Sequence, residues 1–214
     1  MAEKLTKLDE SVRGDHTKIL ASDQIYFWKE YTSGRDYRFG PGNDLISNLK
    51  KKPHASSVAE LRHKARVMAE CSHFFRSAIN QEWLQNATIV PIPPSKMASE
   101  PGYDDRIAKV CRDIRPNPPL DVRRLVYQTK SLPASHEAGP GERVTVDELL
   151  EVYAIDEQLA ARPTKSSAIF DDVLTAGVHY RAMYTVLSAR FPNVPIVGFF
   201  VARRVFPNDQ EVDD

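Results

Sequence analysis

Short apolar runs separated by helical stretches dominate the chain from residue 88 onward. Each run has the length and composition of a buried strand, and apolar residues recur at helical spacing between the runs. Strands that alternate with helices predict a parallel sheet, so the expected fold class is α/β. The expected strands are 88–92 (TIVPI), 122–127 (VRRLVY), 151–155 (EVYAI), 167–170 (SAIF) and 195–202 (PIVGFFVA), and the expected helices are 103–114, 145–150 and 178–190.

The residues before 88 predict smaller elements. Two bulky, aromatic runs within 23–39 flank Ser33, Gly34 and Arg35, which is typical of a β-hairpin. A short helix is expected near 45–52. A long helix is expected from about 57 to 80, because Ser57 and Glu60 match a capping box. We therefore expect an N-terminal extension over 1–56 that is hood-like or docks a partner, an α/β domain over 57–205, and an acidic tail over 206–214.

Composition excludes several classes of protein. Hydrophobic residues make up 42% of the chain, which is too many for a disordered protein, and the longest apolar run, 194–202, is too short to cross a membrane. The first twenty residues lack the apolar stretch of a secretory signal, so we expect a cytoplasmic protein. The 29 basic and 29 acidic residues argue against nucleic-acid binding by bulk charge. Cys71 and Cys111 are expected to be buried free thiols.

The segment 166–179, SSAIFDDVLTAGVH, carries the strongest functional signal. It predicts a buried strand, the carboxylates Asp171 and Asp172 at the end of that strand, a turn with Thr175 and Gly177, and a helix that begins near Val178. Unpaired backbone N–H groups and the helix dipole make such a turn a seat for phosphate. Two carboxylates can accept hydrogen bonds from neighbouring sugar hydroxyls. The pattern therefore predicts a ligand with a phosphate near a diol, such as a ribose 5-phosphate.

The run IFDDVLTAG resembles the phosphoribosyl pyrophosphate motif of type I phosphoribosyltransferases. A second run, TIVPIPPSK followed by GYDDR, is similar to the subgroup related to the competence protein ComF, although the competence-type zinc finger is absent. The resemblance covers most of residues 43–204. It implies a type I phosphoribosyltransferase-like parallel sheet flanked by helices. It also implies transfer of a phosphoribosyl group from phosphoribosyl pyrophosphate, with Mg²⁺, to a nitrogen nucleophile that the sequence does not identify.

The resemblance also implies roles for individual residues. Asp171 and Asp172 would hold the ribose 2- and 3-hydroxyls and contact Mg²⁺ indirectly through the ribose. Lys96 would act with them as a catalytic residue on the departing pyrophosphate. The remaining contacts fall on a 5-phosphate loop (Thr175, Ala176, Gly177, Val178 and His179), on the turn after the first strand (Pro93, Pro94 and Ser95), and on a closing loop over 128–143 (Lys130, His136 and Arg143).

Two alternatives stay open at the level of sequence. Ala176, Val178 and His179 replace the small or hydroxyl-bearing residues usual in the phosphate loop, although a protonated His179 could substitute for a lost hydroxyl contact. A non-catalytic sensor of a nucleotide or phosphate, acting in DNA uptake or bacterial defence, is therefore the rival hypothesis. The basic residues of 50–76 are either an anion or nucleic-acid face or a solvated helix face, and the aromatic residues of 26–31 either pack or dock a partner. A homodimer is also considered.

Overall fold

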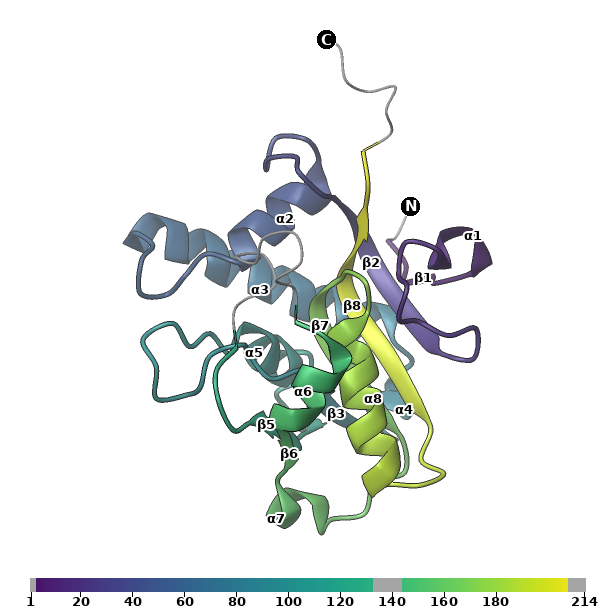
Figure 1. The fold of residues 1–214 in the computed structure, drawn as a ribbon. Coiled ribbons are helices and arrows are strands. Elements are labelled where there is room, and N and C mark those ends of the chain that lie inside the picture. The colour runs from purple at the N-terminus through teal and green to yellow at the C-terminus, as the bar shows by residue number, and fades with distance from the viewer. Residues whose placement is uncertain (1–2, 133–143, 208–214) are drawn as a thin grey trace.

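The structure, a computed structural model, describes residues 3–132 and 144–207 of the chain. A six-stranded sheet in the order β1-β2-β8-β7-β3-β4 forms its centre, and helices flank both faces (Figure 1). All neighbouring strands are parallel except β1 and β2, so the α/β prediction is confirmed with a mixed sheet. The strands of this sheet are β1 (Thr6–Lys7), β2 (Gln24–Thr32), β3 (Thr88–Pro91), β4 (Asp121–Val122), β7 (Ser167–Leu174) and β8 (Ile196–Val205).

Ten further elements surround or extend the sheet. The helices are α1 (Glu10–Arg13), α2 (Pro41–Leu49), α3 (Val58–Ala78), α4 (Gln81–Asn86), α5 (Arg106–Asp113), α6 (Val146–Val152), α7 (Glu157–Ala160) and α8 (Val178–Arg190). A separate antiparallel ribbon consists of β5 (Val126–Gln128) and β6 (Tyr153–Ile155). The long helix α3 begins as predicted, because the Ser57 side chain and the Glu60 side chain cap each other's backbone.

The chain leaves β3 and β7 in opposite directions. From β3 it passes through α5 to β4 on one side of the sheet order, and from β7 it passes through α8 to β8 on the other side. In open α/β sheets a crevice forms at the carboxyl ends of two strands whose connections diverge in this way, and ligands bind there. The topology therefore places a candidate site at the ends of β3 and β7, which are hydrogen-bonded neighbours.

Two hydrophobic cores cover the two faces of the sheet. One core unites α2, α3, α4 and α5 with side chains such as Phe170, and the other unites α6, α8 and the β5–β6 ribbon with side chains such as Ile169. Figure 1 shows α8 in front of the strands, with α2 and α3 to their left. Ile169 and Phe170 are adjacent in β7 and belong to different cores, as expected for neighbouring strand residues that point to opposite faces.

The expected hairpin over 23–39 is wrong. Its first run forms β2, but residues after Thr32 form turns that lead into α2. β2 pairs in parallel with β8, more than 160 residues later, and antiparallel with the short β1, so both of its edges are occupied. Residues on both sides of the expected boundary at 56 and 57 thus contribute strands to one sheet. The expected docking role of the N-terminal region stays a prediction.

Two expected strands lie mostly outside the main sheet. The run 122–127 divides into β4, which contributes two residues to the sheet edge, and β5, which belongs to the ribbon. The run 151–155 begins as the end of α6 and continues as β6. Arg123 separates β4 from β5, and it is buried and donates to backbone carbonyls of Arg162 and Pro163. Its backbone N–H still donates to Ile89 O of β3 at 2.8 Å, so the chain leaves the sheet after this residue.

Other expectations from composition are confirmed for the described residues. Cys71 and Cys111 are buried free thiols in α3 and α5. Phe27 and Trp28 belong to the two cores, so part of the N-terminal aromatic cluster packs inside the protein. Among the described residues, no helix has the length and apolar character needed to span a membrane.

Candidate functional site

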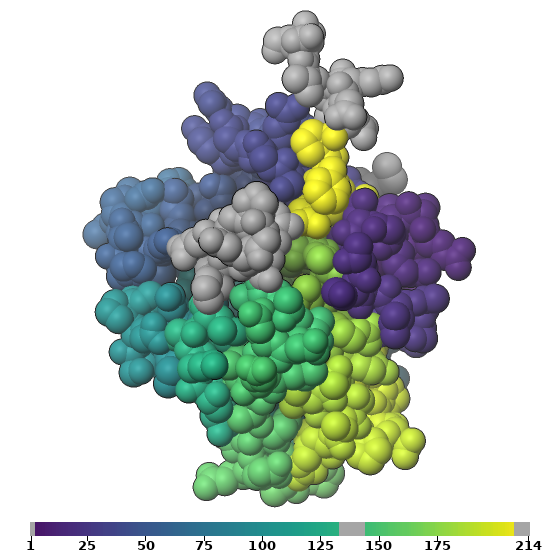
Figure 2. Space-filling model, viewed as in Figure 1, coloured from purple at the N-terminus to yellow at the C-terminus, as the bar shows by residue number. Residues whose placement is uncertain are grey.

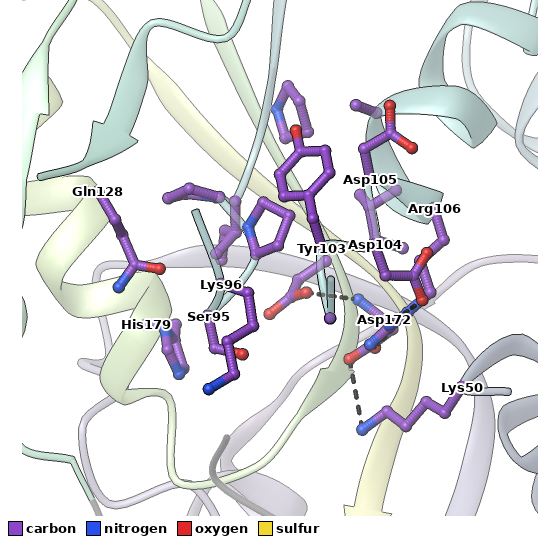
Figure 3. A pocket seen from close by; sticks show the side chains of 18 of the residues that line it. Lys50, Ser95, Lys96, Tyr103, Asp104, Asp105, Arg106, Gln128, Asp172 and His179 are labelled. Carbon is purple, nitrogen blue, oxygen red and sulfur yellow. Dashed lines mark hydrogen bonds and ion pairs between the residues drawn. The ribbon is translucent and has the colours of Figure 1, made fainter. Parts of the chain in front are cut away.

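A cleft of about 980 Å³ lies at the carboxyl ends of β3 and β7, where the topology places it. Residues from the end of β7, from the turn after β3 and from the segment before α5 line this cleft, and so do residues from β5 and from the chain just after α2. Figure 3 shows Gln128 and His179 on one side of the cleft, Lys50 and Arg106 on the other, and Ser95 and Lys96 between them. The cleft therefore unites segments that are far apart in the sequence.

The two adjacent aspartates lie within β7 rather than at its end. Pairing with β8 continues past them to Leu174, so the expected end of the strand at residue 170 is wrong. Asp172 is hydrogen-bonded to Arg106 of α5. Asp171 lies near Tyr153 of β6, since burial and then the charge of Asp171 raise the pKa of that phenol. The two carboxylates therefore have different surroundings, although both line the cleft.

Asp172 is held in a buried network of charges. Its carboxylate accepts hydrogen bonds from Arg106 Nη2 at 2.5 Å and Nε at 3.1 Å, and Lys50 Nζ lies 3.6 Å from its other oxygen. Arg106 also donates to Asp104, which is ion-paired with the buried Lys64. Burial opposes ionisation of Asp172, but the charges of Lys50 and Arg106 outweigh burial and hold its pKa below the ordinary value.

Asp171 has no ion pair with a cation in the part of the chain that the structure describes. Its Oδ1 accepts a hydrogen bond from the backbone N–H of Asp172 at 2.8 Å, and no cation of the described residues forms an ion pair with it. Burial, and then the negative charge of Asp172, raises the pKa of Asp171 to about 7. Near neutral pH this side chain can therefore either accept or donate a hydrogen bond in the cleft.

The turn after β3 borders the cleft as the sequence predicts. Pro93, Pro94, Ser95 and Lys96 all line it. Residues that follow β5 fix this turn, because Leu132 N–H donates to Ser95 O at 3.0 Å and Met97 N–H donates to Ser131 Oγ at 2.9 Å. Lys130 is exposed and is not part of the cleft lining. His136 and Arg143 lie outside the described residues.

An N-terminal segment, residues 9–23, packs against the expected phosphate loop. His16 Nδ1 is hydrogen-bonded to Thr175 O, and Lys18 N–H donates to Ala176 O at 2.8 Å. Gly177 has φ +87°, and a Cβ there would lie 2.5 Å from Ile19 Cδ1, so this glycine serves contact with Ile19. Figure 2 shows the N-terminal segment in purple against the yellow-green part of the chain. One face of the loop is thus occupied by protein.

Only some residues of the expected phosphate loop lie at the cleft. Thr175 and His179 line the cleft, whereas Ala176, Gly177 and Val178 are absent from its lining. Gly177 is the N-cap of α8 and makes no side-chain cap, so the first N–H groups of this 13-residue helix have no side-chain acceptor at that position. The geometry allows an anion to approach the helix N-terminus beside Thr175.

Burial works against the positive charge that the sequence suggests for His179. Burial lowers its pKa to about 4, so its imidazole is neutral at pH 7. Tyr153 Oη lies 3.0 Å from its Nδ1, which joins the β5–β6 ribbon to the first turn of α8. The structure thus shows His179 in a polar contact between two elements, and its expected contact with phosphate stays a prediction.

Sequence reasoning missed the cations that neutralise Asp172. Arg106 lies 66 residues from its partner, and it stands in the GYDDR run that carries part of the family resemblance. That run was the signal from which Arg106 could have been predicted. An arginine at the start of a helix that follows a strand end places a positive charge beside the sheet. Lys50 follows α2 in the run KKK, where nothing local distinguishes it from its neighbours.

The fold and cleft define an α/β protein with a polar site at the divergence of two parallel strands. Comparison with models of protein families and with curated proteins finds no match to this chain. The site must therefore be interpreted from its own residues.

Proposed function

We propose that this protein binds phosphoribosyl pyrophosphate in the cleft and transfers its phosphoribosyl group to a nitrogen nucleophile. One observation carries the proposal: the Asp171–Thr175 segment and the turn at 93–96 border the same cleft, from neighbouring parallel strands. A sugar bearing a phosphate at one end and a pyrophosphate at the other would contact both. A type I phosphoribosyltransferase fold is part of this proposal, and the sheet and its divergence of connections support it.

Each part of the substrate has a matching group in the cleft. In this proposal Asp171 accepts the ribose hydroxyls, because it is the carboxylate without an ion pair among the described residues. Thr175 and the N-terminus of α8 receive the 5-phosphate. Lys96 and Lys50, which both line the cleft, lie beside the pyrophosphate. Asp172 positions Arg106 and Lys50 in this scheme, and it is not itself a sugar ligand.

A site for Mg²⁺ is compatible with these residues. Mg²⁺ is commonly held by one or two carboxylates together with substrate phosphates and water, and Asp171 is a carboxylate of that kind. Among the described residues, no cluster of three or more His, Cys, Asp or Glu side chains could hold a metal alone. In this proposal the ion would bind together with the substrate phosphates, and it would supply charge that stabilises the leaving pyrophosphate.

The proposed reaction needs positioning and charge stabilisation. The bond between ribose C1 and the pyrophosphate oxygen breaks with its electron pair on oxygen, and the nitrogen lone pair forms the new bond to C1. The nitrogen loses its proton to the released pyrophosphate or to water. Lys96 and Lys50 stabilise the negative charge that develops on pyrophosphate. Asp171 holds the ribose so that C1 is open to the nucleophile.

A specific observation also favours a second candidate, the non-catalytic sensor. Arg106 and Lys50 already neutralise Asp172, and His179 is neutral, so fewer charged groups are available than the sequence suggests. A site of this kind could bind a phosphorylated ribose without cleaving it.

Release of pyrophosphate separates the two candidates. We would incubate the protein with phosphoribosyl pyrophosphate, Mg²⁺ and a panel of nitrogen bases, and compare it with Asp171→Asn. The proposal predicts base-stimulated release that Asp171→Asn lowers at least about 100-fold, because substrate positioning is lost. Asp113→Asn, at an exposed carboxylate of α5, is the matched control. Binding without release by any base would assign the sensor function instead.

A further inference from the structure

Gln128 places a buried amide group at the cleft. It is the last residue of β5, paired with Tyr153 of β6, and only 8% of it is exposed. Neither its Oε1 nor its Nε2 has a hydrogen-bond partner among the described residues. Gln128 also lines the cleft, and Figure 3 shows its amide on the same side as His179.

A buried amide without partners is costly for the free protein. Its oxygen and nitrogen lose hydrogen bonds to water when they are buried, and residues 3–132 and 144–207 give none in return. An apolar side chain of similar size would avoid this loss. Val126 illustrates this alternative, since it lies two residues earlier on the same face of β5 and belongs to the hydrophobic core.

The amide is well suited to one class of ligand. It places one acceptor and one donor next to each other in a plane. A ligand group with a donor beside an acceptor completes both hydrogen bonds at once, as a carboxamide or the lactam edge of a nucleobase does. A carboxylate offers two acceptors and an amidine two donors. Each would therefore place an acceptor against Oε1 or a donor against Nε2 of Gln128, and that atom would stay without a hydrogen bond.

We propose that Gln128 is a binding residue that recognises a planar amide or lactam group in the cleft. For the identity of the acceptor this inference rests on the proposed function, because it makes the nitrogen nucleophile a carboxamide or lactam-bearing heterocycle. Recognition of an amide by Gln128 is independent of phosphoribosyl transfer. It can therefore be tested with simple probes in the absence of phosphoribosyl pyrophosphate.

Three planar probes of nearly equal shape test the hydrogen-bonding pattern: benzamide, benzamidine and benzoate. We would measure their dissociation constants by calorimetry at pH 8, for the full chain and for Gln128→Glu. The full chain should bind benzamide more tightly than benzamidine. In Gln128→Glu the ratio of the two dissociation constants should change by about tenfold or more in favour of benzamidine, because the substitution turns one donor into an acceptor. An unchanged ratio would overturn the proposal. The ratio cancels any common attraction of amidines to Asp171.

A stability measurement keeps the proposal testable if the glutamate variant does not fold. Gln128→Met removes both unpaired atoms, so the melting temperature of the ligand-free protein should rise by about 2–4 °C while benzamide binding is lost. A lower melting temperature with unchanged benzamide binding would show that Gln128 is structural. Benzamide recognition in a protein that fails to bind phosphoribosyl pyrophosphate would refute the proposed function while leaving this inference intact.

Discussion

At the scale of single residues, the difference between Asp171 and Asp172 determines what the cleft can bind. The two side chains are chemically identical and adjacent, yet one is paired with Arg106 and Lys50 and the other has no ion pair among the described residues. The difference follows from their neighbours, because Asp172 is bonded to Arg106 of α5 and Asp171 lies near Tyr153 of β6. The account therefore assigns substrate contact to Asp171 and a positioning role to Asp172.

Loss of Arg106 should strongly destabilise the protein. Arg106→Met leaves the buried Asp172 with a weakened set of partners, and removing one member of a buried pair costs about 3 kcal/mol. The low pKa of Asp172 means that its contribution is present above the unfolded pKa and is lost as pH falls through the folded value. Urea unfolding should therefore give Arg106→Met a much lower free energy of unfolding than the wild-type chain at pH 7. This difference should become smaller toward pH 3.

Arg38→Met is the matched control for this prediction. Arg38 pairs with Asp36 at 2.6 Å, but 75% of its side chain is exposed. Its loss should therefore change the free energy of unfolding very little, because solvent screens an exposed pair. Equal effects of the two substitutions would contradict the buried network.

Asp171 should make the protein less stable as pH rises. Its pKa of about 7 lies above the unfolded value, so its favourable protonation in the folded state is lost as pH increases toward and through 7. Asp171→Asn should thus stabilise the chain at pH 8 by about 2 kcal/mol, and should change it little at pH 4. Thermal unfolding of both proteins from pH 4 to 8 tests this. A constant difference across that range would refute the raised pKa.

At the scale of elements, the N-terminal segment supports the phosphate loop. The His16 bond to Thr175 O and the contact of Ile19 with Gly177 lie behind the loop. Arg181 of α8 strengthens this attachment, since it is ion-paired with Asp23 and donates to Lys18 O at 3.1 Å. The loop therefore depends on residues more than 150 positions earlier in the chain.

Removal of the His16 side chain should loosen this loop. His16→Ala should accelerate hydrogen exchange of the backbone amides of 175–178 about tenfold or more and weaken binding of ribose 5-phosphate, because one carbonyl loses its donor. His16→Asn should restore much of the protection, since its side-chain nitrogen can take the place of Nδ1. Equal exchange in the wild-type chain and His16→Ala would exclude the supporting role.

Local patterns predicted helices better than they predicted strand partners. The capping box at Ser57 and Glu60 lies within one turn, so sequence alone located the start of α3. β2 was mistaken for half of a hairpin because its parallel partner, β8, lies far along the chain. The end of β7 was missed because two carboxylates resemble a solvated turn unless Arg106 and Lys50 are known to neutralise one of them. In the candidate site, the sequence likewise predicted the turn at 93–96 with its cation Lys96, but not the cations Arg106 and Lys50.

At the scale of the whole molecule, the sheet divides the interior into two cores, and both cysteines belong to the same one. Burial raises the pKa of Cys71 to about 12 and raises the pKa of Cys111 as well. Both thiols are therefore protonated and shielded in the folded chain.

The two thiols should report global unfolding. A thiol reagent such as dithionitrobenzoate should label neither Cys71 nor Cys111 in native buffer on the timescale that labels both in urea. The Cys71→Ala and Cys111→Ala variants identify which thiol reacts. Rapid labelling of one cysteine in native buffer would show that α3 or α5 opens independently of the rest of the core.

The central claim is that the cleft binds a phosphoribosyl ligand through Asp171. The most direct measurement is a calorimetric titration of phosphoribosyl pyrophosphate with Mg²⁺ into the wild-type chain, Asp171→Asn and the control Asp113→Asn. Single variants are preferred to a double aspartate variant, because Asp172 supports a buried network. The account predicts saturable one-to-one binding that Asp171→Asn weakens about tenfold or more and Asp113→Asn leaves unchanged. Absence of saturable binding to the wild-type chain, or equal affinity in Asp171→Asn, would contradict it.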